Sequence, residues 1–191
     1  MKLQFDSSLI SEIAIRYSFQ EDVEALEAGK KIKSREYTRE NLRKIFEWKT
    51  NGRGRSRLEK NSDEDIADAL RLAVEAKTDR AAIAVLMGLS GVQVAVASAI
   101  LTAIDPERFT IIDFRALEAL GISQPVISIN FYLKYLDNCR DLARKNNVSL
   151  RTLDRALWQW SKEASGVLPI RSVGNPASQV PKSKLQHGGS S

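Results

Sequence analysis

The feature that most constrains the fold of this chain is a stretch of 24 residues, Ala81 to Ile104, without a single charged side chain. Its length alone would allow a membrane-spanning helix. However, the stretch is mostly alanine and valine, contains Gln93, and is interrupted by Gly88-Leu89-Ser90-Gly91, which is typical of a turn. We therefore expect two buried helices of about ten residues each, joined by a tight turn, and no membrane segment.

The rest of the chain shows helical patterns up to about residue 164. Apolar residues recur three and four positions apart, and no segment has the sustained alternation of a half-buried strand. The predicted N-cap residues are Asp6, Thr38, Ser62, Asp113 and Ser149, and Gly121 suits a left-handed C-terminal cap. The predicted helices include about 7–19, 21–28, 39–48, 114–120, 126–146 and 150–165. The sequence therefore predicts an all-α fold.

The domain organisation follows from the length and from a change in composition near residue 166. A chain of 191 residues has room for one sizeable core. Three of the five prolines and four of the ten glycines fall in the last 26 residues, which lack a helical or strand pattern. We predict a single α-helical domain over residues 1–165, with the hairpin at about 80–104, followed by a flexible C-terminal tail over 166–191.

The scarcity of cysteine and histidine limits the chemistry of this chain. Cys139 is its one cysteine and His187 its one histidine, so it has no internal disulfide and lacks the ligands of a structural zinc site or an iron–sulfur cluster. We predict no metal and no cofactor. The first residues contain no apolar run of signal-peptide length, which predicts a cytoplasmic protein.

The net charge of +5 is concentrated in one segment. Residues 30–60 contain twelve basic and four acidic side chains, giving +8, so the remainder of the chain carries −3. A local positive field attracts a phosphate backbone, and a tryptophan such as Trp48 can stack on an unpaired base. The predicted DNA contacts in this segment are Lys49, Arg53, Arg55 and Arg57. The alternative is an ordinary solvated loop, with Trp48 in the core.

The start of the second hairpin helix is a second candidate for phosphate binding, because a helix N-terminus presents unpaired N–H groups and the positive end of its dipole. The sequence Leu89-Ser90-Gly91-Val92, followed by Ala97 and Ile100-Leu101, resembles the helix-hairpin-helix motif of the helix-hairpin-helix DNA glycosylase superfamily (HhH-GPD type). The resemblance covers about residues 80–121 and implies that the hairpin binds a DNA phosphate. The residues it places there are Gly91, Val92, Gln93, Val94 and Ala95. Gln93 stands where the family has a second glycine.

The same resemblance assigns a role to Asp113. The family places an aspartate at the start of the helix after the hairpin, and Asp113 has that spacing and follows the apolar pair Ile111-Ile112. Its implied role is to stabilise positive charge on the sugar and activate water while the N-glycosidic bond breaks. Ala95 occupies the position of the lysine of lyase members, which implies a monofunctional glycosylase of base excision repair. Taken alone, Asp113 is better explained as an N-cap; its spacing from the hairpin makes the two interpretations equal, and one residue can have both roles.

A glycosylase must take its target base out of the DNA stack into a pocket. The candidate pocket aromatics are Tyr37 and Trp48, with Trp158 and Trp160 as further candidates, although large aromatics at helical spacing more often belong to the core. Two other functions stay open. The first is a non-catalytic DNA-binding module of the same fold, which Gln93 favours. The second is an α-helical protein-interaction unit.

Overall fold

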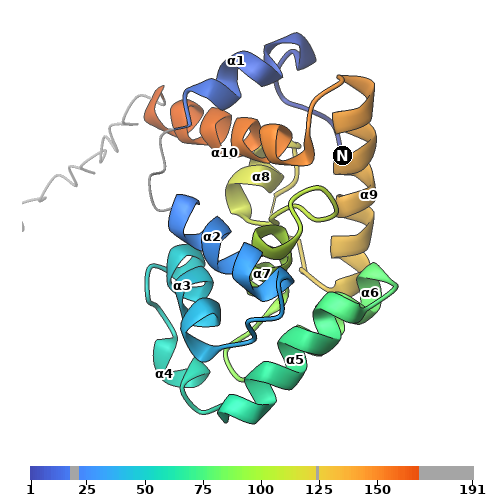
Figure 1. The fold of residues 1–191 in the computed structure, drawn as a ribbon. Helices are drawn as coiled ribbons and strands as arrows, with labels where there is room; N and C mark the ends of the chain where they lie inside the picture. Colours follow the sequence, from blue (N-terminus) through green and yellow to red (C-terminus); the bar gives the residue numbers. More distant parts are fainter. Residues whose placement is uncertain (18–21, 124, 168–191) are drawn as a thin grey trace, which may run out of the picture.

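The computed structural model describes residues 1–17, 22–123 and 125–167, with side chains as far as residue 165. Within these residues every regular element is a helix and no strand is present, which confirms the predicted all-α class (Figure 1). None of the described helices combines the length and hydropathy needed to cross a membrane. The elements are the 3₁₀ helix η1 (Ser7–Leu9) and the helices α1 (Ile10–Ile15), α2 (Asp22–Lys33), α3 (Arg39–Thr50), α4 (Arg55–Leu58), α5 (Asp63–Glu75), α6 (Asp79–Leu86), α7 (Val94–Ile104), α8 (Phe114–Ala119), α9 (Ile129–Lys145) and α10 (Leu150–Val167).

Polar N-cap residues start several of these helices, as predicted. The side chains of Thr38, before α3, and Ser149, before α10, each accept a hydrogen bond from the backbone N–H three residues later. Ser62 and Asp65 form a reciprocal capping box at the start of α5. Gly121 follows α8 with a φ of +70°, as expected for a left-handed cap. These local signals place four helix boundaries.

The predicted helices 7–19 and 126–146 differ from the structure at one boundary each. The predicted helix 7–19 is a 3₁₀ turn capped by Asp6, followed by α1, which ends at Ile15 because the next two backbone N–H groups bond three residues back and tighten the last turn. Residues 18–21 lie outside the described part. The predicted helix 126–146 begins only at Ile129, because Ser128 supplies the N-cap.

Helix α2 is longer than predicted and packs very closely on α7. It was predicted to end at Ala28 but continues to Lys33, with Gly29 in its interior. A Cβ at Gly29 would lie 1.9 Å from the carbonyl oxygen of Ala103 on α7. The absence of a side chain at Gly29 therefore allows α2 to approach the backbone of α7 closely.

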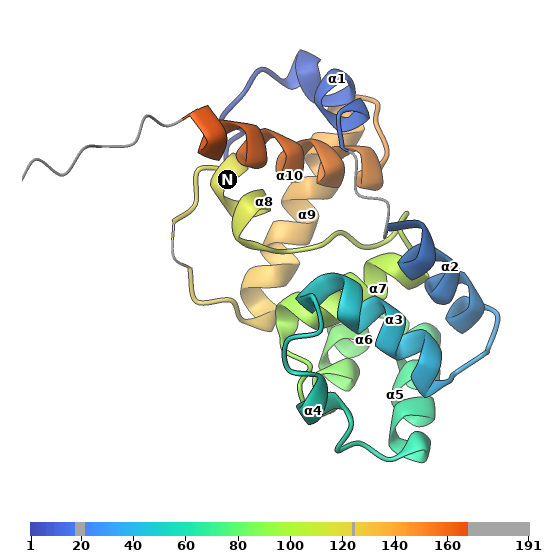
Figure 2. The same cartoon turned by 90° about the vertical axis from the view of Figure 1, so that its left-hand side faces the viewer.

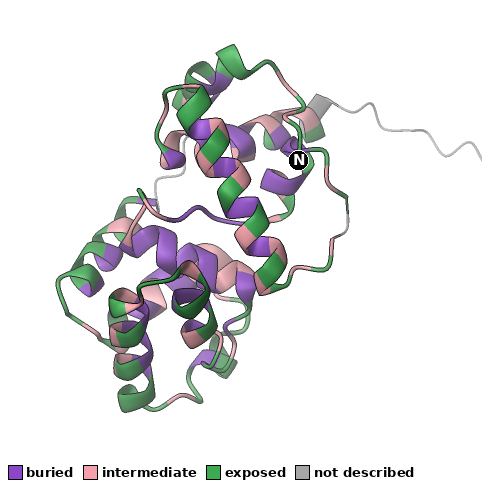
Figure 3. Cartoon of the chain, turned by 90° about the vertical axis from the view of Figure 1, so that its right-hand side faces the viewer, coloured by how far each residue is buried: buried purple, intermediate pink, exposed green. Residues whose placement is uncertain are grey.

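The helices form two lobes, seen most clearly in Figure 2. In the hairpin lobe, α2 packs on α3 and α7, α3 on α7, and α5 on α6. In the second lobe, which we call the C-terminal lobe, α10 packs on α1, α8 and α9. The buried side chains of the described residues form one connected hydrophobic cluster that runs through both lobes (Figure 3). The chain passes between the lobes through residues 105–113, which we call the connecting segment.

An ion-pair network joins α6 of the hairpin lobe to α9 of the C-terminal lobe. Asp79 on α6 accepts hydrogen bonds from Nε of Arg108 (2.8 Å) and Nη1 of Arg140 (2.7 Å). Burial opposes ionisation here, but the two guanidinium groups hold the pKa of Asp79 below its ordinary value. Arg140 also donates to the carbonyl oxygen of Arg108 (2.6 Å), which anchors the connecting segment on α9. Helix α10 ends at Val167, and residues 168–191 of the predicted tail, with His187, lie outside the described residues.

Candidate functional site

A cavity of about 380 Å³ lies between the two lobes. This volume falls within the range of small-molecule sites, about 300–1,000 Å³. The hairpin lobe contributes the end of α3 and the turn after it: Trp48, Lys49, Asn51 and Arg53. From the C-terminal lobe, the starts of α8 and α10 contribute Asp113, Phe114, Arg115, Arg151, Asp154 and Trp158. Thus Asp113, Lys49, Arg53 and Trp48, four of the predicted site residues, line one cavity.

Asp113 both caps α8 and lines the cavity. Its Oδ1 accepts a hydrogen bond from the N–H of Ala116 (3.0 Å). Its Oδ2 accepts one from Nζ of Lys49 (3.1 Å), and the two side chains are only 21% and 14% exposed. The N-cap interpretation of Asp113 is therefore confirmed, and its role as a site residue, with which this position is compatible, stays a prediction. Lys49, predicted as a phosphate contact, is instead bound to the candidate catalytic carboxylate.

Two buried tyrosines and a serine fix the connecting segment that leads into Asp113. Tyr135 donates a hydrogen bond to the carbonyl oxygen of Ile111 (2.6 Å), and Tyr132 donates to that of Thr110 (3.1 Å). Ser98 on α7 accepts from the N–H of Ile112 (3.1 Å). Burial raises the pKa of both phenols, so they stay neutral donors. The predicted buried approach to Asp113 is confirmed, since both isoleucines lie in the interior.

Four charged side chains form an ion-pair cluster where α10 meets α2, and two of them, Arg151 and Asp154, line the cavity. We call Asp22, Arg151, Asp154 and Arg155 the cavity floor. Arg151 bonds both Asp154 and Asp22, and Arg155 Nη2 donates to Asp22 Oδ2 (2.8 Å). Both carboxylates are buried. Loss of water raises the pKa of Asp154 to about 6, because it outweighs the attraction of Arg151.

Arginine side chains already lie over the aromatic rings that line the cavity. The guanidinium of Arg151 lies over the rings of Trp48 and Tyr17, 5.8 and 5.7 Å from their centroids. That of Arg115 lies 5.2 Å from the centroid of Trp158. Tyr17 and Trp158 meet edge to face at 5.3 Å. Each of these three rings is therefore packed against positive charge.

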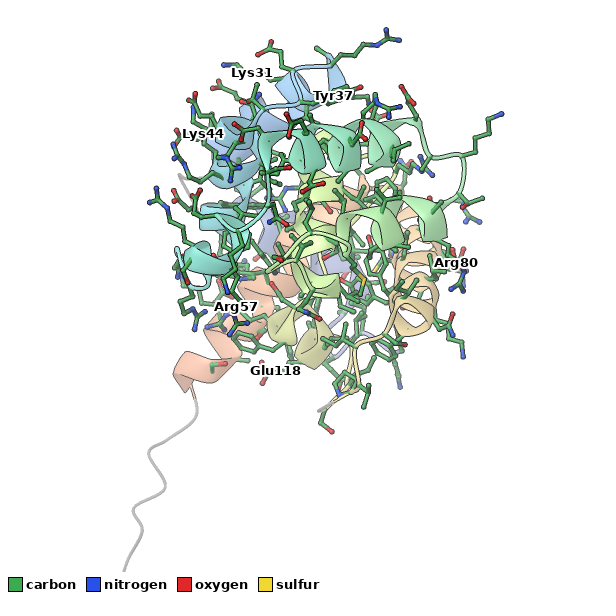
Figure 4. The ribbon with its side chains drawn as sticks, turned by 90° about the horizontal axis from the view of Figure 1, so that it is seen from below. Lys31, Tyr37, Lys44, Arg57, Arg80 and Glu118 are labelled. Atoms are coloured by element: carbon green, nitrogen blue, oxygen red, sulfur yellow. The ribbon has the colours of Figure 1, made fainter. Side chains whose placement is uncertain are left out.

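Other aromatic candidates lie outside the cavity. Tyr37 precedes α3, and Trp48 lies near the other end of that helix, so the two are about 17 Å apart along its axis. Figure 4 shows Tyr37 beside α5, far from Arg57. Trp160 stacks on Phe5 with a centroid distance of 5.6 Å and packs against the core. Only Trp48 and Trp158 of the predicted aromatics line the cavity.

The remaining predicted arginines lie on and around α4, a short helix that the sequence predicted only as a turn. Arg55 forms ion pairs with Glu47 (3.1 Å) and Glu59 (3.5 Å) on a separate concave surface between α2 and α3. Arg57 is exposed and lies beside the hairpin turn, because a Cβ at Gly91 would be 3.1 Å from that of Arg57. The structure therefore brings Arg57, but not Arg55, to the hairpin.

The basic stretch 30–60 is partly neutralised within the protein. Ion pairs with described acids are formed by Lys33, Arg39, Lys44, Lys49 and Arg55. The residues without such a pair are Lys30, Lys31, Arg35, Arg43, Arg53, Arg57 and Lys60. Lys31, Lys44 and Arg57 follow one edge of the molecule along α2, α3 and α4 (Figure 4). This edge is the basic surface that the sequence predicted.

The hairpin turn is held by Asn61, which follows α4. Its side chain accepts a hydrogen bond from the N–H of Ser90 (2.8 Å) and donates to the carbonyl oxygen of Ser90 (3.1 Å). Gly91 has a φ of +87°, a conformation that side chains disfavour. The turn is therefore a rigid element packed on the basic segment.

The first turn of α7 holds the residues predicted to bind phosphate. Gln93 is the N-cap residue, is exposed, and its side chain makes no capping hydrogen bond. The N–H of Val92 is bonded within the turn, and that of Ala97 is bonded to Gln93. The N–H groups of Val94 and Ala95 precede the first intrahelical bond, as in any helix. The Val92 N–H is thus already used within the turn, and phosphate binding at the first turn of α7 stays a prediction.

Sequence reasoning missed most of the C-terminal lobe's side of the cavity. Asp154 and Arg155 follow Arg151 by three and four residues, which puts the three charged side chains on one face of α10. This spacing was the available signal, because charged side chains three and four residues apart can pair on a helix. Asp22 and Tyr17 gave no comparable signal, because they reach the site from the other end of the chain.

No group of three or more His, Cys, Asp or Glu side chains in the described residues is arranged to hold a metal ion. The donors and acceptors of the cavity are guanidinium, ammonium, carboxylate, amide and indole groups. No protein-family model, curated protein or solved structure gives a significant match to this chain.

Proposed function

We propose that this protein is a DNA-binding protein of the helix-hairpin-helix glycosylase type that hydrolyses the N-glycosidic bond of a damaged or modified base, without lyase activity. The observation that carries the proposal is the position of Asp113, a carboxylate on the wall of a 380 Å³ cavity also lined by Trp48 and Trp158. A base turned out of the duplex would occupy this cavity between the two indoles.

The chemistry requires one carboxylate and one water molecule. As the bond between C1′ and the base nitrogen breaks, positive charge develops on the sugar, and Asp113 stabilises it. Water then adds its oxygen to C1′ and gives a proton to Asp113, while the departing base keeps the bonding electron pair and takes a proton from solvent. Lys49 must release Oδ2 for this step, and a DNA phosphate is a natural alternative partner for its ammonium group.

The surface around the cavity supports DNA as the substrate. Lys31 and the ion-paired Lys44 lie along one edge of the molecule, and Arg57 extends this edge to the hairpin turn. Arginine and lysine side chains that neutralise phosphates make binding strongly dependent on salt. The amides at the start of α7 would add a phosphate contact that needs no side chain.

The experiment compares wild type with Asp113→Asn for base release from single- and double-stranded DNA that carries uracil, hypoxanthine, 8-oxoguanine or alkylated bases. We expect release of at least one base by wild type and at least about a 100-fold loss in the variant. Asparagine still accepts the capping hydrogen bond from Ala116, so the variant should fold. The control is Asp137→Asn, an exposed acid on α9. Release of no base, or equal rates for Asp113→Asn and wild type, would contradict the proposal.

The ion pair between Lys49 and Asp113 favours one second function, a non-catalytic DNA-binding module of the same fold. Both oxygens of Asp113 already accept hydrogen bonds, and Gln93 replaces the second hairpin glycine. Salt-dependent DNA binding without release of any base would identify this function.

A further inference from the structure

The cavity lining carries more positive than negative charge. Its charged residues are four cations, Lys49, Arg53, Arg115 and Arg151, and two carboxylates, Asp113 and Asp154. Each carboxylate is already held by a lining cation, through the Lys49–Asp113 and Arg151–Asp154 pairs. Arg53 and Arg115 form no ion pair with a described acid. The cavity therefore offers no spare carboxylate to a positively charged ligand.

The aromatic walls lead to the same conclusion independently. A cationic ring is normally held by the electron-rich face of an aromatic side chain. Here Arg151 covers a face of Trp48 and of Tyr17, and Arg115 and Lys162 lie 5.2 and 5.1 Å from the centroid of Trp158. A cationic base stacked on these rings would lie close to the positive charges that already cover them, and the two charges would repel each other.

The same groups suit an uncharged ring with carbonyl oxygens. A guanidinium presents five N–H donors and no acceptor, and the lining also includes the ammonium of Lys49 and the amide of Asn51. Deamination and oxidation of a base add carbonyl acceptors, whereas alkylation of a ring nitrogen adds positive charge.

We infer that the cavity takes uncharged bases with carbonyl edges, such as deaminated or oxidised bases, and excludes bases that alkylation has made cationic. This inference rests on the proposed function and names the substrate class of the same site. The lining carries two net positive charges. At about 6 Å from a bound cationic base, and with the screening of water, they weaken its binding by about tenfold.

The test uses two bases of the same shape and different charge. Otherwise identical duplexes carry 7-methylguanine, which is cationic, 7-methyl-7-deazaguanine, which is neutral, or guanine at one position. Dissociation constants are measured by fluorescence anisotropy, which needs no chemistry. The dissociation constant of each modified duplex is divided by that of the guanine duplex. We expect this ratio to be about tenfold lower for the neutral isostere than for the cation.

Charge variants identify the cavity as the source of this preference. Arg115→Gln removes one lining cation and should narrow the tenfold ratio to about threefold. Arg144→Gln removes a cation that is 76% exposed on α9, away from the cavity, and should leave the ratio unchanged. Circular dichroism melting confirms that both variants fold.

The outcomes separate this inference from the proposed function. Equal binding of the cation and its isostere, or equal narrowing by the two variants, overturns the charge preference and leaves base release intact. Three equal affinities also overturn it, because then the charge of the base at this position has no effect and no base enters the cavity. If no base is released from any DNA, the glycosylase proposal fails, while the binding ratio still decides the preference.

Discussion

The cavity floor and the hairpin are neighbouring regions that are stabilised by opposite means. In the cavity floor, two buried carboxylates are held between α2 and α10 by the largely buried Arg151 and by Arg155, which is 38% exposed. The hairpin has no charge over residues 81–104 and is stabilised by small residues in close contact, such as Gly29 against Ala103. One region depends on electrostatics and the other on steric fit.

This contrast separates the scaffold from the site. Desolvating charges costs free energy that their mutual attraction does not always return, so a purely structural junction between α2 and α10 would be at least as stable if it were apolar. Buried charges with displaced pKa values cluster at functional sites. We therefore interpret the cavity floor as part of the site and the hairpin as the frame that positions Asp113 through Ser98.

The largest effect is expected from Asp22→Ala in the cavity floor. It leaves Arg155 without a partner and Arg151 with only Asp154, and we expect the free energy of unfolding to fall by about 3–5 kcal/mol. Urea unfolding followed by circular dichroism measures it. The control is Glu27→Ala on the same helix, an exposed acid for which we expect a change within about 0.5 kcal/mol. Similar losses in both variants would mean that the cavity floor is not a special electrostatic site.

A pH-dependent effect is expected at Asp154. Its pKa is about 6 in the folded protein, above its ordinary 3.8, so the folded state binds the proton more tightly than the unfolded state. The stability that the protonated form gives is complete below pH 3.8 and is lost as pH rises through 6. The unfolding free energy of Asp154→Asn minus that of wild type should therefore rise by about 2 kcal/mol between pH 4 and pH 6, out of about 3 kcal/mol in all, and stay level above pH 7. A flat difference across this range would contradict the raised pKa.

The same contrast explains how much could be predicted from sequence. The hairpin was predictable because its signals are local: an uncharged run, a Gly-Ser turn and capping residues within a few positions of each helix end. Asp113 could be proposed as a site residue because its spacing from the hairpin resembles that of a known family, and its position on the cavity wall is compatible with that prediction. Each signal lies within about 30 residues of sequence.

The cavity floor was not predictable, because its contacts join distant parts of the chain. Arg155 and Asp22 are separated by 133 positions, and Lys49 and Asp113 by 64. The prediction for α2 stopped before Gly29 because glycine weakens an isolated helix, but the close contact with α7 requires glycine there. Tyr37 was selected as an aromatic near the basic stretch, but α3 separates it from Trp48 by the length of a helix.

The smallest effect is expected in the hairpin, where two glycines with similar backbone conformations isolate the contribution of packing. Gly91 has a φ of +87° and Gly52 a φ of +75°, so alanine brings a comparable backbone cost of about 1–2 kcal/mol at either position. A Cβ at Gly91 would lie 3.1 Å from Arg57 Cβ and 3.2 Å from the backbone nitrogen of Leu58, whereas one at Gly52 would meet nothing within 4 Å. Gly91→Ala should therefore be more destabilising than Gly52→Ala by about 1 kcal/mol in urea unfolding. Equal losses would mean that the hairpin turn yields to the added methyl group and is less rigid than its contacts with α4 indicate.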